Sequence, residues 1–87
     1  MSFMRSFFDG KNANGDATDQ RFLTQLIIDV AEGRKKDRDL TGFLRQRNWS
    51  KFETGKRIIH ALLKVKVHRA DLYGRAREIV EPIYMAR

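Results

Sequence analysis

Basic side chains that could bind phosphate groups are concentrated in the middle of this chain. Residues 34–69 contain twelve Lys or Arg against three Asp or Glu, a net charge of +9. The rest of the 87-residue chain has six basic and eight acidic residues, a net charge of −2. A segment this basic favours an anionic partner, which could be nucleic acid, an acidic protein surface or a lipid surface.

Nucleic-acid binding through phosphate groups is the function that this pattern favours most. Phosphate neutralisation requires many cations on one side of a rigid element. A helical projection of residues 51–66 places Lys56, Arg57, His60 and Lys64 on one outer side. The predicted nucleic-acid contacts are Arg34, Lys35, Lys36, Arg38, Arg45, Arg47, Lys51, Lys56, Arg57 and Lys64.

The helices expected over residues 39–47 and 51–66 have the order of a helix-turn-helix, with Asn48 and Trp49 in the turn. Such a motif would bring four side chains to the major groove: Lys51, Thr54, Lys56 and Arg57. The sequence departs from the motif because Leu44 stands where a small residue is preferred. Asn and Gln are scarce over residues 51–66, so phosphate contacts would outweigh contacts with base edges.

Docking on an acidic face of a larger protein, as a small regulator, adaptor or inhibitor, is the main alternative. This alternative predicts an apolar anchor beside the basic surface. Ile28, Tyr84, Met85 and the aromatic residues of segment 1–8 could supply it. Ile28 could also mark a contact between two copies of the chain. A third alternative is peripheral membrane binding through residues 1–8 and the basic segment.

Catalysis, a metal site and a bound cofactor are not expected. The chain has no cysteine, so thiolate nucleophiles, disulfides and thiolate metal sites are excluded. His60 and His68 have no companions at ligand spacing, and the acidic residues are explained as helix caps or polar faces. Residues 9–16 echo a calcium loop, but Gly10 stands where a ligand Asp is needed, and Arg21 stands where the bidentate Glu is needed.

The pattern of apolar residues predicts one all-α domain. Residues 1–16 are expected to form an N-terminal segment and loop, because residues 9–16 are rich in Gly, Asn and Asp. Residues 17–87 are expected to form a helical domain with a single core. The predicted helices are residues 17–32, 39–47, 51–66 and 70–81, and a short helical turn could form near the N-terminus.

Local signals predict where these helices begin and end. The expected N-terminal caps are Asp16 or Thr18, Asp37 or Asp39, and Ser50. Gly33 and Asn48 suit helix exits, and Pro82 is expected to end or kink the last helix. The predicted buried residues are Phe22, Leu23, Leu26, Ile27, Val30, Leu40, Phe43, Leu44, Phe52, Ile58, Ile59, Leu62, Leu63, Leu72, Ala76, Ile79, Val80 and Ile83.

Two further expectations concern Gly55 and the cellular location. Gly55 falls on the predicted buried side of its helix, so a close helix crossing is expected there, and Gly55→Leu should overpack the core. The longest wholly apolar run is Leu26-Ile27-Ile28, so no membrane span is expected. The first eight residues lack the apolar stretch of a signal peptide, and a cytoplasmic location is therefore expected.

Overall fold

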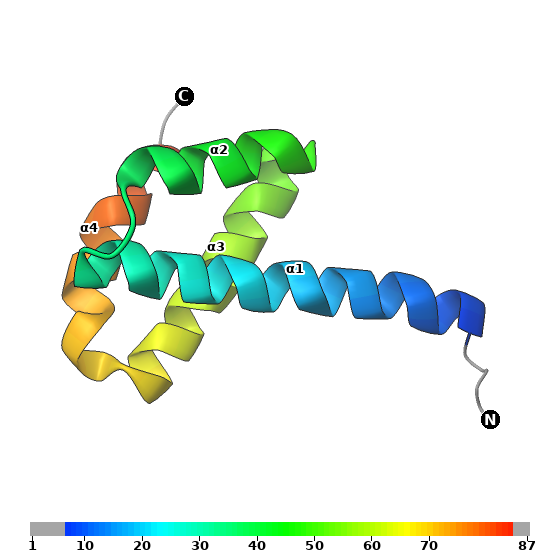
Figure 1. Cartoon of the computed structure of the whole chain (residues 1–87), viewed down its shortest axis with the longest axis horizontal. Coiled ribbons are helices and arrows are strands. Elements are labelled where there is room, and N and C mark those ends of the chain that lie inside the picture. Colours follow the sequence, from blue (N-terminus) through cyan, green and yellow to red (C-terminus); the bar gives the residue numbers. More distant parts are fainter. Residues whose placement is uncertain (1–6, 85–87) are drawn as a thin grey trace.

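The computed structural model describes the backbone of residues 7–84 and the side chains of residues 17–83. This part of the chain forms four helices and no strand: α1 (Phe7–Glu32), α2 (Asp37–Arg47), α3 (Lys51–His68) and α4 (Ala70–Tyr84) (Figure 1). The prediction of a small all-α bundle of four helices is confirmed.

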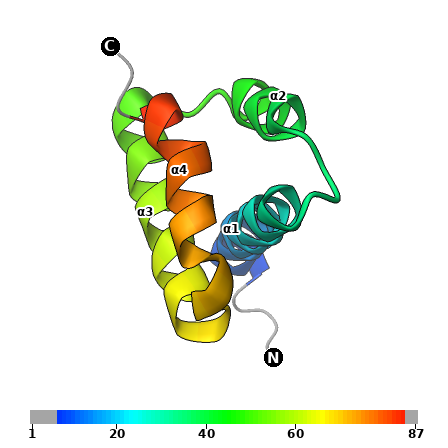
Figure 2. The same ribbon diagram turned by 90° about the vertical axis from the view of Figure 1, so that its left-hand side faces the viewer.

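The four helices pack in two layers. α3 and α4 form an antiparallel pair, and α1 crosses this pair and contacts both helices (Figures 1 and 2). α2 runs back along α1 in the opposite direction and packs mainly on it. The N-terminal end of α1 extends beyond the other helices (Figure 1). Its 26 residues span about 39 Å at a rise of about 1.5 Å per residue, most of the longest dimension of 42 Å.

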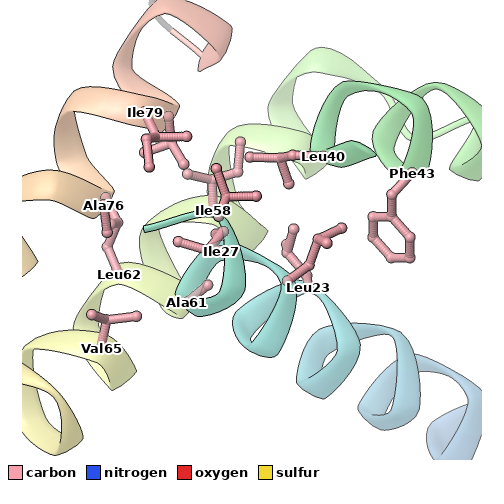
Figure 3. Packing of buried hydrophobic residues seen from close by; sticks show 13 residues of the cluster. Leu23, Ile27, Leu40, Phe43, Ile58, Ala61, Leu62, Val65, Ala76 and Ile79 are labelled. Carbon is pink, nitrogen blue, oxygen red and sulfur yellow. The ribbon is translucent and has the colours of Figure 1, made fainter. Parts of the chain in front are cut away.

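The core lies where α1 meets the α3–α4 pair, with α2 closing one side. Apolar side chains from all four helices meet there (Figure 3). The largest fully buried ones are Leu23, Ile27, Leu40, Ile58, Val65 and Val80. Each stabilises the fold by about 1.5–3 kcal/mol through burial. No polar or charged side chain is buried among residues 17–83, so the core is held by apolar packing.

α1 begins at Phe7, so the predicted loop over residues 9–16 and the predicted caps Asp16 and Thr18 are wrong. Gly lowers helix stability by about 1 kcal/mol relative to Ala, and Asn by less. An established helix gains one hydrogen bond for each residue added. The packed half of α1 therefore supports its extension through this segment. Phe7 belongs to α1, whereas the first residues of the predicted N-terminal turn lie outside the described part.

α1 ends at the predicted glycine. Gly33 has a left-handed backbone with φ of 88°, which glycine adopts without a steric penalty. The Gly33 N–H donates to the Val30 carbonyl (3.1 Å), and the Arg34 N–H donates to the Asp29 carbonyl (2.8 Å). These two bonds form a Schellman motif, which satisfies carbonyls that the helix end would leave free.

α2 begins at Asp37, and Lys36 occupies the N-cap position, so the predicted caps Asp37 and Asp39 are wrong. Asp39 still stabilises the start of α2, because its carboxylate accepts a hydrogen bond from the Lys36 N–H at 2.9 Å. The predicted exit is confirmed: Asn48 adopts a left-handed backbone with φ of 57°. Both ends of α2 therefore carry their own local signals.

α3 begins at the predicted cap, where the Ser50 hydroxyl accepts a hydrogen bond from the Glu53 N–H at 3.0 Å. The Glu53 carboxylate accepts a hydrogen bond from the Arg57 guanidinium at 2.7 Å. In a full capping box it would instead accept one from the Ser50 N–H. α3 ends at His68, slightly beyond the predicted end at residue 66. The two extra residues accompany the burial of Val65, whose carbonyl accepts a hydrogen bond from the Arg69 N–H directly after the helix.

α4 contains Pro82 and continues to Tyr84, so the predicted end at residue 81 is wrong and, of the two predicted effects of Pro82, ending the helix does not occur. Proline removes the hydrogen bond to the carbonyl four residues earlier, which belongs to the exposed Glu78. Because only the last turn follows Pro82, one lost bond does not interrupt the helix. Ile83 packs on the core as predicted, whereas the side chain of Tyr84 and Met85 lie outside the described part.

The buried side of α3 differs from the prediction. The core side consists of Ile58, Ala61, Leu62 and Val65. Three residues that were predicted to be buried are instead exposed: Phe52 by 77%, Ile59 by 49% and Leu63 by 58%. α3 is apolar on two sides, and the pattern alone does not say which side meets α1 and α4.

Three other burial predictions are also corrected. Phe22 was predicted to be buried but is 55% exposed, although its ring lies 5.2 Å from that of Phe43. Ile28 was predicted to be exposed but is half-buried and packs against the core. A Cβ atom added at Gly55 would meet nothing within 4 Å, so the predicted close helix crossing is absent and overpacking is not expected there.

Candidate nucleic-acid interface

The twelve cations of residues 34–69 fall into a paired and an unpaired set. Five have a carboxylate within 4.0 Å: Arg34, Arg47, Lys56, Arg57 and Arg69. The other seven form no ion pair with another residue of 17–83: Lys35, Lys36, Arg38, Arg45, Lys51, Lys64 and Lys66. The basic segment is therefore not one uniform cationic surface.

Four of the unpaired cations lie on α2 or directly before its first residue. We call Lys35, Lys36, Arg38 and Arg45 the α2 ridge. All four side chains are exposed. Arg38 and Arg45 are seven residues apart, which is about two helical turns, so they lie on the same side of α2. That side points away from Leu40 and Phe43, the buried residues of α2.

Arg34 and Arg47 are less available to a ligand than the sequence suggested. Arg34 lies 3.1 Å from the Glu32 carboxylate at the end of α1. Arg47 lies 4.0 Å from Asp19 and stacks over the Phe43 ring at 4.3 Å. Its Nε is buried without a hydrogen bond to the described residues. Arg47 therefore covers the α1–α2 contact and does not belong to the α2 ridge.

Arg57 packs into the structure although the helical projection placed it on an outer, solvated face. Its side chain is only 12% exposed and contacts the Glu53 carboxylate at 2.7 Å. Its guanidinium lies 4.5 Å from the centre of the Trp49 ring and donates to the Gln20 side chain at 3.4 Å. The Gln20 amide in turn donates to the Arg57 carbonyl at 3.0 Å. Arg57 thus joins α1 to the start of α3.

The helix-turn-helix contact set predicted on α3 does not form. Of its four residues, Thr54 is half-buried and Arg57 is mostly covered. Lys51 and Lys56 are exposed, but they are five positions apart on the helix, so they point to different sides of α3. No shared surface on α3 presents all four side chains to a groove.

A groove of about 560 Å³ runs between α1 and α3, and most of its lining surface is apolar. Its walls include Ile28 together with the polar side chains of Gln20, Arg21, Thr24, His60, Lys64 and His68. The three α3 side chains, at intervals of four residues, could donate hydrogen bonds to an anion. The described residues contain no cluster of three or more potential His, Cys, Asp or Glu metal ligands. Sequence reasoning missed this groove because it depends on how α1 packs against α3.

An apolar surface on α3 also escaped the sequence. We call Phe52, Ile59, Leu63 and Val67 the α3 stripe; Val67 is 74% exposed. Their spacing of seven, four and four residues places them along one side of α3. The only sequence signal was that α3 has more apolar residues than one buried side requires.

Arg69 is neutralised at the corner between α3 and α4. Its guanidinium contacts Glu32 at 2.9 Å and Asp71 at 3.1 Å. The hydrogen bonds from Arg69 hold the pKa of Asp71 below its ordinary value, and the bonds to Asp71 and Glu32 raise the pKa of Arg69. Arg69 therefore stabilises the corner and is not a free anion ligand.

Among residues 7–84, no helix combines the length and apolarity needed to cross a membrane. Comparison of the chain with protein-family models, curated proteins and solved structures found no match.

Proposed function

We propose that this protein is a non-catalytic binder of nucleic acid that contacts phosphate groups mainly through the α2 ridge. The observation that supports this proposal is the exposure of four ridge cations that have no carboxylate partner among residues 17–83. A phosphate that binds such a cation displaces no internal ion pair. Lys51 and Lys64 are also exposed and have no carboxylate partner in the described part of the chain, and they could extend the contact.

The dimensions of the α2 ridge suit a phosphate backbone. Arg38 and Arg45 are separated by about 10 Å along the helix axis at about 1.5 Å per residue. Each strand of a duplex carries one phosphate charge per about 3.4 Å of the duplex axis, so two arginines this far apart can contact different phosphate groups. Asp37 and Asp39 lie in the first turn of α2 and lower the local positive charge. We therefore expect moderate, salt-dependent binding with little sequence preference.

Fluorescence anisotropy with labelled double-stranded DNA, single-stranded DNA and RNA at several salt concentrations tests the proposal. For duplex DNA, the logarithm of the affinity should fall with the logarithm of salt concentration by about 0.9 per neutralised phosphate. Arg38→Glu should weaken binding and lower this slope by about one contact. An acidic residue is favourable in the first turn of α2, so this variant should keep its fold.

Arg75→Glu is the matched control, because Arg75 is an exposed arginine on α4 and the charge change is identical. It should leave the salt slope unchanged. Absence of binding at low salt would refute the proposal. Equal weakening by the two variants would show that net charge matters and that the α2 ridge is not the contact surface.

A second candidate function, docking on another protein as a regulator or adaptor, is supported by the α3 stripe. The sequence suggested that an apolar anchor beside basic residues would distinguish this function from nucleic-acid binding. Phe52 and Val67 are the most exposed large apolar side chains of residues 17–83, and lysines border them on α3. Phosphate binding gives no reason for such exposed apolar side chains.

A further inference from the structure

The α3 stripe contains four of the five large apolar side chains that are exposed within residues 17–83. The opposite side of α3 is fully occupied by the core (Figure 3). A helix that is apolar on both sides is normally covered on both. The stripe runs from Phe52 to Val67, about 22 Å at about 1.5 Å per residue, which matches four turns of a partner helix.

The shape of this surface favours a protein side chain as its occupant. Leu63 and Val67 line a shallow hollow of about 310 Å³, whose other walls are His60, Lys64 and His68. A large apolar side chain inserted into such a hollow is typical of interface hot spots. A lipid surface offers no single side chain to fill it.

The positive charge of α3 favours a negatively charged partner for the α3 stripe. α3 carries five basic residues against Glu53 alone, a net charge of +4. Lys56 lies 5.8 Å from the Phe52 ring, and Lys66 lies 5.4 Å from the Tyr73 ring of α4. Both distances are from the ammonium nitrogen to the ring centre, so each positive charge lies over an aromatic ring. That of Lys56 lies at the Phe52 end of the α3 stripe.

We propose that the α3 stripe docks an acidic amphipathic helix of another protein. The apolar side of that helix would cover the stripe, and its Glu or Asp residues would face the bordering lysines. If two copies of this chain docked through α3, two helices with a net charge of +4 each would face one another, and their repulsion would be unfavourable. The inference deepens the second candidate function and does not depend on nucleic-acid binding, because the α2 ridge is a separate surface.

A displayed library of amphipathic helices of about 15 residues, a length of about 22 Å, tests this inference on the full-length chain. The library has a fixed leucine side, and its flanking positions vary between Glu and Lys. Helices with Glu flanks should be enriched. A peptide selected from the library and then synthesised should bind the Ile59→Ser/Leu63→Ser variant at least about tenfold more weakly than the wild type. This is a loss of about 1.4 kcal/mol in binding free energy.

Phe22→Ser is the matched control, because it removes a comparably exposed apolar side chain from α1; it should leave peptide binding unchanged. Circular dichroism should show that the Ile59→Ser/Leu63→Ser variant keeps its helices. The inference would be overturned if helices with Lys flanks were enriched or if no helix were enriched. Equal binding of the peptide by the wild type and by Ile59→Ser/Leu63→Ser would overturn it as well.

Two parallel measurements separate the other occupants. Flotation with phosphatidylserine vesicles detects lipid binding, and sedimentation equilibrium detects self-association. Lipid binding or a dimer that is lost in Ile59→Ser/Leu63→Ser would assign the α3 stripe to that occupant and overturn the inference. The same variant should keep its affinity for labelled DNA, so a failure of peptide docking and a failure of nucleic-acid binding give different results.

Discussion

Replacing glycine by alanine should stabilise this protein at three positions and destabilise it at a fourth. A Cβ atom at Gly42, Gly55 or Gly74 would meet nothing within 4 Å. Each glycine lies inside a helix, where alanine is favoured by about 0.8–1.0 kcal/mol. We expect each substitution to raise the free energy of unfolding by about 0.4–1 kcal/mol. Gly33→Ala should lower it by about 1–2 kcal/mol, because Gly33 is left-handed.

Thermal unfolding followed by circular dichroism measures these effects. For a domain of this size, about 1 kcal/mol shifts Tm by roughly 4–8 °C. The effects of Gly42→Ala, Gly55→Ala and Gly74→Ala should add, because the three positions lie in different helices. A lower Tm for Gly55→Ala would refute the open space described around α3. A higher Tm for Gly33→Ala would refute the Schellman geometry at the end of α1.

Three further predictions concern the core, the start of α3 and pH. Ile58→Ala should lower the free energy of unfolding by about 2–5 kcal/mol, measured with urea, because Ile58 is fully buried. Arg57→Glu should lower it by about 1.5–3 kcal/mol, whereas a merely solvated arginine would give almost no change in the same urea titration. Arg69 depresses the pKa of Asp71, so the carboxylate stabilises the fold above its ordinary pKa of about 3.9, and this contribution is lost as the pH falls through the depressed value. Asp71→Asn should therefore lose less stability than the wild type in melts between about pH 5 and pH 2; equal losses would contradict this assignment.

Three of the helix ends could be predicted because their signals are local. Ser50 caps α3 with its own hydroxyl, and Gly33 and Asn48 supply the left-handed backbone that ends α1 and α2. These effects depend on a few neighbouring residues. The start of α1 could not be predicted in the same way, because its extension to Phe7 depends on the packed half of the helix.

The candidate surfaces could be predicted only in part. The α2 ridge was contained in the predicted contacts, because charge is visible in the sequence. The helical projection could not show that Arg57 faces Trp49 and Gln20, since both partners lie in other elements. It also grouped Phe52 with Ile58, although α1 and α4 cover only the side of α3 that bears Ile58.

The attachment of α2 has a consequence for hydrogen exchange. α2 packs mainly on α1, buries only Leu40 and Phe43, and is bounded by Lys36 and Asn48. An element attached in this way can open as a unit while the rest of the fold persists. Amide protons of α2 should then exchange at a lower free energy than those in the core of α1 and α3. A ligand bound to the α2 ridge would slow this exchange, because it stabilises the closed form. The apparent affinity of the ligand would be reduced in proportion to the fraction of molecules in which α2 is open.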